Sequence, residues 1–535
     1  MELGETLLVS AAAIGASWLR MGIALTISII FSLAVGILAG TNKRAERLII
    51  PLLDILQSIP ILGFFPLALY GFYSLIPFLG AELASIFLIF TSQVWNMTFA
   101  VYESTRVIGS ELLESARSMR LTVLDRMRYI YVPASMPRLL QNLQPSWSNG
   151  IFFLVGSEIL TFGRADITLF GLGSLISDFV EAGDTRAVLT LLTLLVVAAV
   201  LTNLLVFNPL TGLTERRRSK GRGQVGSHPS PPARGIVGWI SLRSGVQVMS
   251  KIPHPNIELH KAIAGITRRV STHWSLLRGL VFFALTALVS VAAISRTADL
   301  GQVLNDLAVA LLEIGPLNLL MATLYSLLRV TAGVLASIAW SLPVALLIFR
   351  SRRGSAAVTT AFQIAASIPV TILYPVISSV LPSADELRAL VLVLMATQWY
   401  VFFQVLGGLR NIPPEELEIA EMYRLSYLDR LRYLYLWRAM PALVTGCVVA
   451  AGGAWNALVI AERIVLGNIR EEVSAPGLGK LLSIMVEKGD LYSIIIIVLV
   501  MAAVIVGLNR GLWKRLYDLV VSRLRTEDVK EHGYA

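Results

Sequence analysis

The chain has 535 residues, of which 55% are hydrophobic and only 15% are charged, and its mean hydropathy is +0.71. A soluble globular protein carries about 25% charged residues, so this composition excludes a soluble protein and indicates one embedded in a lipid bilayer. The net charge of +10 does not indicate nucleic-acid binding, because basic residues gather in the cytoplasmic loops of membrane proteins.

The N-terminal sequence MELGETLLVS is acidic where a cleavable signal peptide would be basic, so we expect no such peptide. A spanning helix needs about 20 mainly apolar residues, and such runs recur along the whole chain. We expect about eleven spanning helices. They lie near residues 18–40, 49–76, 81–102, 139–162 and 187–208 in the first half, and near 276–295, 322–349, 356–380, 387–408, 441–466 and 491–512 in the second.

These helices are expected to form two units, residues 1–210 with five helices and 276–515 with six. A basic linker at 211–275 joins them, and a tail at 516–535 follows. The linker is rich in Gly, Pro, Ser and Arg and cannot bury a hydrophobic core. Because basic and acidic loops alternate, the positive-inside rule places the linker and the tail in the cytoplasm and the N-terminus outside.

The two halves repeat each other. Early in each half the matching residues are 309 apart, as in Arg20 and Arg329, and later they are 304 apart, as in Glu114 and Glu418. An even number of expected crossings separates equivalent helices, so both halves have the same orientation. The sequence therefore predicts an all-α integral membrane protein with about eleven transmembrane helices in two parallel tandem repeats.

One long cytoplasmic segment in each half carries the most informative local pattern. Apolar residues at helical spacing predict a short amphipathic helix, followed by a turn and a cluster of charges. Such a helix must bury its apolar face on its own bundle, on lipid or on a partner, and two matched segments favour a two-fold partner. The residues expected at this contact are Glu111, Glu114, Ala116, Arg120, Asp125, Arg126 and Arg128, and Glu415, Glu418, Ala420, Arg424, Asp429, Arg430 and Arg432.

These segments resemble the EAA signature of importer permeases of the ATP-binding-cassette superfamily. That signature is Glu-Ala-Ala, three residues, Gly, nine residues, and then Ile-x-Leu-Pro. The first half has Glu114-Ser115-Ala116 and then Arg120, and the second has Glu418-Ile419-Ala420 and then Arg424, with the spacing kept. Arginine replaces the glycine in both halves, which makes a left-handed turn there costly, and the second half also lacks the proline.

The runs QSIPILGFFPLAL, FGLGSLI and PGLGKLL resemble permeases of the nitrate, sulfonate and taurine type, in their duplicated form. This resemblance implies a plasma-membrane subunit that imports a small solute, such as one of these anions. As partners it implies two separate ATP-binding-cassette ATPase subunits and an extracytoplasmic binding protein, besides the lipid bilayer. The chain has no phosphate-binding loop, so we assign ATP hydrolysis to the partners and expect no enzyme activity, cofactor, metal site or nucleic-acid partner.

The candidates for the transport path are Ser58, Pro60, Glu158, Ser367, Pro369 and Glu462. Each proline frees a backbone carbonyl, which lines a substrate path in some transporters and only marks a packing kink in others. The two glutamates lie near the outer boundary of the bilayer, where a carboxylate either lines the pore or extends to the interface.

Arg20 and Arg329 lie near the outer ends of their helices. They are expected either to attract an anion or to anchor the helices at the interface.

Two other classes of function remain open. A secondary transporter with parallel repeats would need ionisable residues at mid-membrane for ion coupling, and a membrane scaffold would give the two matched cytoplasmic segments no purpose.

Overall fold

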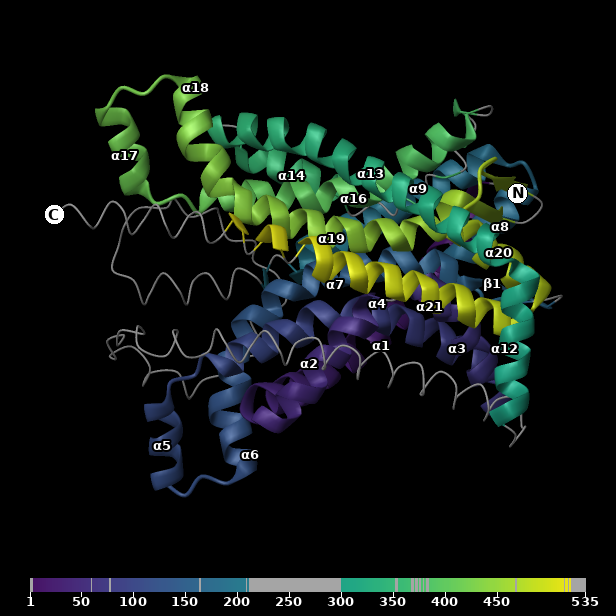
Figure 1. Ribbon diagram of the computed structural model, residues 1–535, viewed down its shortest axis with the longest axis horizontal. Coiled ribbons are helices and arrows are strands. Elements are labelled where there is room, and N and C mark those ends of the chain that lie inside the picture. The colour runs from purple at the N-terminus through teal and green to yellow at the C-terminus, as the bar shows by residue number, and fades with distance from the viewer. Residues whose placement is uncertain are drawn as a thin grey trace. The chain divides into compact units, whose positions relative to one another are not determined.

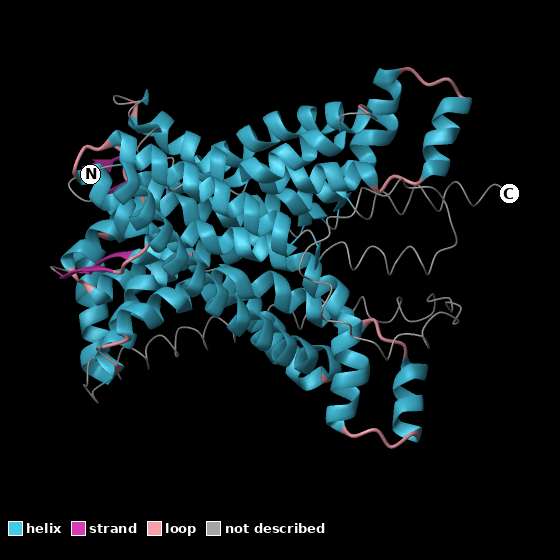
Figure 2. Cartoon of the chain, turned by 180° about the vertical axis from the view of Figure 1, so that it is seen from behind, coloured by secondary structure: helices cyan, strands magenta, loops and turns pink. Residues whose placement is uncertain are grey.

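The computed structural model describes residues 3–210 and 300–520, apart from gaps at 59, 77, 163–164, 208, 352–354, 467–468, 514 and 518 and at several positions between 367 and 383. Helices account for nearly all of the described chain (Figure 1). Within the described residues, strands occur only as short hairpins, which Figure 2 shows in magenta. The predicted linker at 211–275, the predicted span at 276–295 and the tail beyond residue 520 lie outside the described residues.

The same order of elements occurs in both halves. The first half contains α1 (Leu3–Thr41), α2 (Lys43–Ser58), α3 (Ile61–Leu75), α4 (Gly80–Arg106), α5 (Ser110–Ser118), α6 (Val123–Arg126), the π-helical turn η1 (Met127–Tyr131), α7 (Val132–Glu158), β1 (Ile159–Phe162), β2 (Ala165–Thr168), α8 (Leu172–Glu181), α9 (Thr185–Thr202) and η2 (Asn203–Phe207). The second contains α12 (Leu300–Ile314), α13 (Pro316–Arg350), α14 (Ser355–Ala366), α16 (Asp385–Arg410), α17 (Pro414–Met422), α18 (Tyr427–Arg430), η4 (Leu431–Tyr435), α19 (Leu436–Glu462), β3 (Arg463–Leu466), β4 (Ile469–Glu472), α20 (Leu478–Lys488), α21 (Leu491–Leu508) and η5 (Asn509–Trp513).

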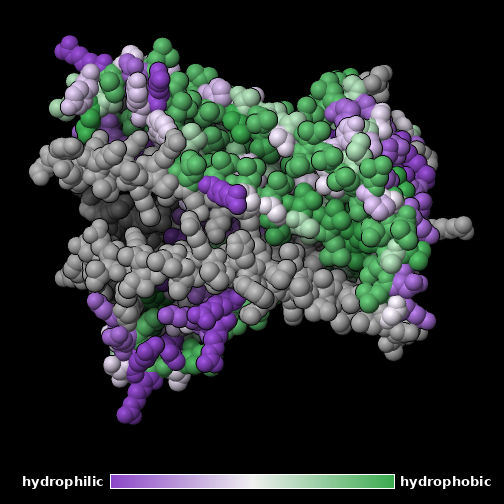
Figure 3. Space-filling view, viewed as in Figure 1, coloured by the Kyte–Doolittle hydropathy of each residue, from purple (hydrophilic) through white to green (hydrophobic). Residues whose placement is uncertain are grey.

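Seven helices of the described chain are long and apolar enough to cross a membrane. Apolar side chains on their flanks are exposed, including Leu19 on α1 and Leu328 on α13, as contact with lipid requires. Figure 3 shows these hydrophobic side chains along the long helices, with hydrophilic ones around α5–α6 and α17–α18. The prediction of an all-α, multi-pass membrane protein is confirmed, whereas the number of eleven spans stays a prediction.

The predicted span at 49–76 is wrong as a single helix. α2 ends at Ser58 and α3 begins at Ile61, because Pro60 has no N–H and disfavours a helical residue before it. The N–H of Ile61 instead donates to Oδ1 of Asn456 on α19, at 2.6 Å. The proline therefore marks a complete break between two helices, and a side chain from the second half caps the new helix.

The predicted spans at 139–162 and 441–466 continue beyond the ends of their helices. α7 ends at Glu158 and α19 ends at Glu462, and each is followed by a two-stranded antiparallel hairpin, β1–β2 or β3–β4. The first strands of the two hairpins, β1 and β3, have the sequences ILTF and RIVL. Their β-branched and aromatic residues suit a strand. Hydropathy cannot separate such a strand from the helix that precedes it.

Two compact units divide the chain, and they differ from the sequence halves. One comprises residues 1–57, 85–157 and 189–290, and the other 58–84, 158–188 and 291–535. The second unit includes α3 from the first half, which packs against α19, α20 and α21. The predicted boundaries follow the repeat and the linker, whereas the compact units follow the packing.

The core of the second unit lies where α13, α16 and α19 pack together. Phe402 and Trp455 are fully buried there. A Cβ added to Gly408 would lie 2.6 Å from Cβ of Ala442, so this glycine lets α16 approach α19 closely. Small residues at helix contacts are the usual means of close packing in membranes.

Single cysteines test the orientation predicted from the loop charges. In a chain whose one native cysteine, Cys447, is replaced by serine, cysteines at the exposed positions Ala182 and Ser474 should react with an impermeant maleimide added to intact cells. A cysteine at Ser118, which lies in a predicted cytoplasmic segment, should react only after lysis. Labelling of that cysteine in intact cells would reverse the orientation.

Candidate functional site

In the first half, α5 and α6 form a loop that holds the predicted docking residues (Figure 1). α5 ends in a Schellman turn, in which Leu121 N–H donates to the carbonyl of Ala116 at 3.0 Å and Arg120 N–H donates to that of Arg117 at 2.9 Å. Arg120 has a φ of 53°, a left-handed conformation that usually requires glycine. Ala116 is buried beneath the turn.

The second half repeats this turn at the end of α17. Leu425 N–H donates to the carbonyl of Ala420 at 3.1 Å, and Arg424 N–H donates to that of Glu421 at 2.9 Å. Arg424 has a φ of 49°, and it and Arg120 are the two non-glycine residues of the described chain with positive φ. The left-handed turn is therefore kept in both halves, although an L-residue there costs about 1–2 kcal/mol.

Aspartates from the predicted charge cluster cap the next short helix. Oγ1 of Thr122 accepts the N–H of Asp125 at 3.2 Å, and Oδ2 of Asp125 accepts the N–H of Thr122 at 3.1 Å, which is a capping box. At the start of α18, Oγ of Ser426 likewise accepts the N–H of Asp429 at 3.2 Å, and the hydroxyl of Ser426 donates to Oδ2 of Asp429 at 2.6 Å. We infer that these two aspartates shape the loops, rather than being free for a partner.

The same contacts affect the charge of Asp125. The hydrogen bonds from Thr122 hold the pKa of the Asp125 carboxyl below its ordinary value. Because the folded-state pKa is lower than the unfolded one, the cap is fully present at neutral pH. It is lost only as the pH falls through the folded-state pKa, which lies below the ordinary value of an aspartate.

A π-helical turn joins each loop to the long helix that follows. η1 leads into α7 and η4 into α19, at equivalent positions. Pro133 follows the first turn, but the equivalent residue in the second half is Trp437, so proline is not the common cause. Such turns occur mainly at functional positions, and this one connects each predicted docking loop to a transmembrane helix.

The arginines of the two loops differ in their hydrogen bonds. Nε of Arg430 donates to a backbone carbonyl of its own turn at 3.0 Å, whereas Nε of the equivalent Arg126 is buried without a hydrogen-bond partner. Arg128 and Arg432 each lie over the ring of the tyrosine that follows, at 5.7 and 5.6 Å, which is a cation–π contact.

Both loops expose large apolar side chains beyond the ends of the long helices. Met119 and Leu124 are 74% and 78% exposed, and their equivalents Tyr423 and Leu428 are 77% and 73% exposed. The predicted docking glutamates Glu111, Glu114, Glu415 and Glu418 are exposed as well. An exposed apolar patch rimmed by charges is typical of a protein interface.

At the opposite end of α19, its last residue, Glu462, is completely buried. Its carboxylate accepts hydrogen bonds from Oγ of Ser326 at 2.7 Å and Nη1 of Arg329 at 2.8 Å. It also accepts the backbone N–H groups of Gly479 and Lys480 in the first turn of α20, at 2.8 and 3.1 Å. A negative charge at a helix N-terminus satisfies orphan N–H groups and interacts favourably with the helix dipole.

Arg329 extends this network to a further helix. Its guanidinium pairs with both oxygens of Glu386 on α16, at 2.8 and 2.6 Å, and donates to the carbonyl of Pro476 at 3.0 Å. The network thus joins α13, α16 and α19 to α20 within one compact unit. The charge of Arg329 is matched by two carboxylates, whereas its predicted role as an anion attractor or an interface anchor stays a prediction.

The repeat places Glu158 at the end of α7 in the same way. It is completely buried and accepts the N–H of Gly173 at 2.7 Å. A Cβ added to Gly171, or to the equivalent Gly477, would overlap the carboxylate of Glu158 or Glu462. The glycines of FGLGSLI and PGLGKLL are therefore needed for the close approach of these carboxylates, a link that sequence spacing did not reveal.

The structure describes some of the predicted transport-path residues. Glu158 and Glu462 are buried acceptors at helix ends, and their place on the transport path stays a prediction. Pro60 is buried at the start of α3, while Ser367 and Pro369 lie outside the described residues. Among the described residues, no group of three or more His, Cys, Asp or Glu side chains is placed to hold a metal ion.

Glycine at the two left-handed positions should relieve strain. Arg120→Gly with Arg424→Gly should raise the free energy of unfolding by about 0.5–1 kcal/mol per site, since glycine accepts φ > 0 but loses more chain entropy. Thermal unfolding in detergent measures this. Arg120→Val should lower stability, because a β-branched residue is an outlier at positive φ, and equal stability of the two variants would contradict the assignment.

Removing the cation from the buried network should be more harmful than removing the whole pair. Arg329→Gln leaves the Glu462 carboxylate buried without its cation and should cost about 3–5 kcal/mol. Adding Glu462→Gln to that variant should recover most of the loss in a thermal unfolding assay. Additive effects of the two changes would show that the residues do not interact.

Comparison with known proteins agrees with the repeated architecture. The sequence profile of the family described as "Binding-protein-dependent transport system inner membrane component" matches residues 32–220 and again 330–518. The chain is similar to a bicarbonate transport system permease protein of Synechococcus elongatus, with 28% identity over 155 residues, 29% of this chain and 54% of that protein.

Two further relatives carry other substrate names. A nitrate import permease protein of Leptolyngbya laminosa is 25% identical over 193 residues, 36% of this chain and 65% of that protein. A Bacillus subtilis protein named for aliphatic sulfonates transport is 27% identical over 192 residues, 36% of this chain and 63% of that protein. The chain thus covers about half to two thirds of these relatives. Because the two profile matches cover more than half of the sequence, the chain belongs to the family of binding-protein-dependent transport system inner membrane components, in a tandem-duplicated form.

Proposed function

We propose that this chain is the transmembrane permease subunit of an ATP-driven importer for a small anion. Two separate ATPase subunits bind its α5–α6 and α17–α18 loops, and an extracytoplasmic binding protein delivers the solute. The observation that carries the proposal is the pair of loops with the same turn, the same cap and the same exposed apolar positions. Membership of the family supports it.

The surface of the loops fits a protein partner better than lipid. Met119, Leu124, Tyr423 and Leu428 stand on segments that carry exposed side chains of both charges, and an exposed apolar patch with a polar rim is typical of a protein interface. Burial of apolar area is worth about 25 cal/mol per Å², so these side chains favour association. Because the two loops have the same backbone, the partner should present the same kind of groove twice.

The long helices offer a mechanical route from the loops to the outer side. α7 and α19 each have 27 residues, a length of about 40 Å at 1.5 Å per residue. Each begins directly after the π turn at a docking loop and ends at the glutamate that caps α8 or α20. When the ATPases bind ATP and draw together, α7 and α19 would transmit the movement of the loops to α8 and α20.

The substrate class rests on the relatives. Their printed names refer to bicarbonate, nitrate and aliphatic sulfonates, all of which are small anions. We therefore propose a small anion as the solute.

The alternative is a secondary transporter with parallel repeats. It needs an intramembrane ionisable group that can exchange a proton or ion. The carboxylate of Glu462 accepts hydrogen bonds from Arg329, Ser326 and two backbone N–H groups. These partners already satisfy its negative charge. This alternative also leaves the exposed loops without a purpose.

Docking can be tested by reversing one exposed charge in each loop. Glu114→Arg with Glu418→Arg should reduce both co-purification of the ATPases and ATP-dependent uptake by about tenfold or more, as expected when contacts worth about 1.4 kcal/mol are lost. Glu181→Arg, an exposed position at the predicted outer side, is the matched control and should have no effect on co-purification.

A second variant removes the apolar contact. Leu124→Asp with Leu428→Asp should also prevent co-purification while leaving thermal unfolding of the chain unchanged, because both side chains are exposed. Normal ATPase binding in both double variants would reject the docking role. Uptake of a neutral sugar but of no anion by the unmodified complex would reject the substrate class alone.

A further inference from the structure

A group of buried polar atoms in the first compact unit has no partner. Oε1 of Gln93, Oγ of Ser146, Nε1 of Trp147 and Oδ1 of Asn203 make no hydrogen bond. Gln93 and Ser146 are 0% exposed, and Trp147 and Asn203 are at most 9% exposed. Buried polar groups are nearly always paired, and within a bilayer no lipid chain can satisfy them. We call these four residues the polar seam.

The first members of the seam meet between α4 and α7. A Cβ added to Gly150 on α7 would lie 2.5 Å from Nε2 of Gln93 on α4. Ser146 lies one helical turn before Gly150, on the same face of α7. The amide nitrogen of Gln93, Nε2, donates to the sulfur of Met21 at 3.9 Å. A thioether sulfur is a weak acceptor.

Trp147, which follows Ser146 on α7, packs between α1 and η2. The ring of Trp147 packs against the ring of Trp18 at 6.1 Å and against that of Phe207 at 5.8 Å. Asn203 begins the π-helical turn that ends at Phe207.

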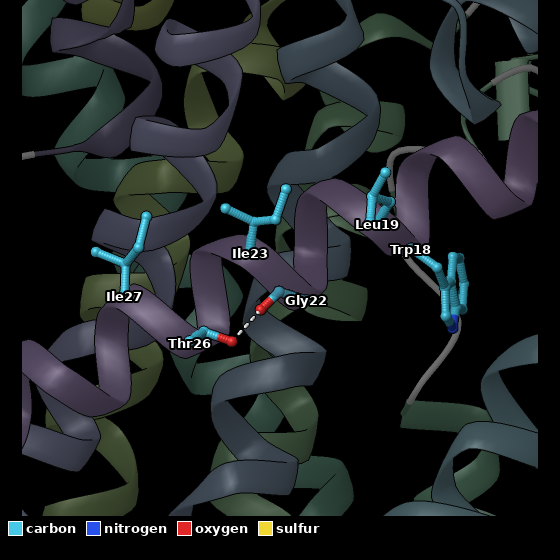
Figure 4. A pocket seen from close by; sticks show the side chains of 6 residues that line it. All are labelled: Trp18, Leu19, Gly22, Ile23, Thr26 and Ile27. Atoms are coloured by element: carbon cyan, nitrogen blue, oxygen red, sulfur yellow. Dashed lines mark hydrogen bonds between the residues drawn. The ribbon is translucent and has the colours of Figure 1, made fainter.

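On α1, Trp18 donates its N–H to Oγ1 of Thr202 at 2.8 Å. Trp18 lines a shallow recess together with Leu19, Ile23 and Ile27, and Figure 4 shows its ring on a different side of α1 from those three side chains. The ring of Trp18 therefore lies toward Trp147, whereas those three apolar side chains do not.

The seam lies near the middle of its helices. Gln93 is the central residue of α4 (Gly80–Arg106), and Ser146 lies next to the centre of α7 (Val132–Glu158). Both are thus about 20 Å from either helix end, close to the bilayer midplane. Substrate sites of membrane transporters typically lie at this depth.

The fold itself does not require polar residues at these positions. In the second half, the residues equivalent to Gln93, Ser146 and Trp147 are Thr397, Ala450 and Ala451. Oγ1 of Thr397 pairs with Oγ of Ser337 at 2.8 Å, and both alanines are buried. At these three positions the backbone of the second half carries apolar or paired side chains, whereas that of the first half carries unpaired ones, and the fourth position is asparagine in both halves, Asn203 and Asn509.

We propose that the polar seam contacts the transported solute, and that the first half alone supplies these contacts. This inference rests on the proposed import function and narrows its substrate to a small hydrogen-bond acceptor. The indole N–H of Trp147 and the hydroxyl of Ser146 are donors. The unpaired oxygens of Gln93 and Asn203 are acceptors, and each of these amides presents a donor to the solute only when it turns over. Neutral donors hold an oxyanion without the desolvation cost of a buried cation. Because the seam is buried here, solute reaches it only when α4 and α7 separate.

Matched cysteines test whether the seam opens. Ser146→Cys and the equivalent Ala450→Cys are made in the Cys447→Ser chain, and each is assembled with its ATPases and binding protein. A small methanethiosulfonate reagent should label the first cysteine during ATP turnover and not the second. The transported anion, chosen from nitrate, bicarbonate and ethanesulfonate by uptake, should suppress that labelling. Equal labelling of both cysteines, or labelling that the anion does not suppress, would overturn the proposal.

A kinetic variant tests the contact itself. Trp147→Phe keeps an aromatic side chain, although a smaller one, and removes the N–H, so it should raise the KM for uptake about tenfold, as expected for loss of one hydrogen bond to a charged group. Trp455→Phe, which changes a buried tryptophan of the second half, is the control and should leave KM unchanged. Ser146→Ala should also raise KM if Trp147→Phe fails to accumulate. An unchanged KM in an accumulating variant rejects the seam, whereas absence of anion uptake by the unmodified complex rejects the import function instead.

Discussion

The structure of the second unit depends on one buried carboxylate. Glu462 ends α19, receives the first N–H groups of α20, and holds Arg329, which in turn reaches Glu386 on α16. A buried charge is tolerated only when its partners satisfy it completely, so four helices have to meet at one point. The glycine before α20 follows from the same constraint, because any side chain at Gly477 would occupy the space of the carboxylate. Glu158 and Gly171 repeat the arrangement in the first half.

Backbone geometry is kept more strictly than residue identity at the cytoplasmic ends. Arg120 and Arg424 both adopt the left-handed conformation that glycine would adopt more easily, and the π turn before α19 forms although α19 lacks the proline found in the first turn of α7. Strain is retained where surrounding contacts fix it, and such positions cluster at functional sites. The shape of these loops is therefore the property that both halves share.

Hydropathy and the repeat predicted the long helices, the two amphipathic loop helices and the all-α class, because these depend on local periodicity and composition. They could not predict the hairpins after Glu158 and Glu462, since apolar strand and apolar helix have the same hydropathy. The break at Pro60 was predicted only as a kink or path feature, because its cap comes from Asn456, far away in the sequence. The pairing of Glu462 with Arg329 and α20 was missed for the same reason. Unpaired groups such as Gln93 Oε1 are visible only when every neighbour is in place.

The position of α3 has a consequence for how the protein is made. This helix is synthesised early, yet it packs against α19, α20 and α21, whose residues emerge from the ribosome more than three hundred positions later. Contacts of such large sequence separation form slowly and leave apolar surfaces open in the meantime. The first half therefore cannot reach its final packing until the second half is in the membrane. Two separately encoded halves would have to find each other by diffusion, whereas one continuous chain keeps them at high local concentration throughout synthesis.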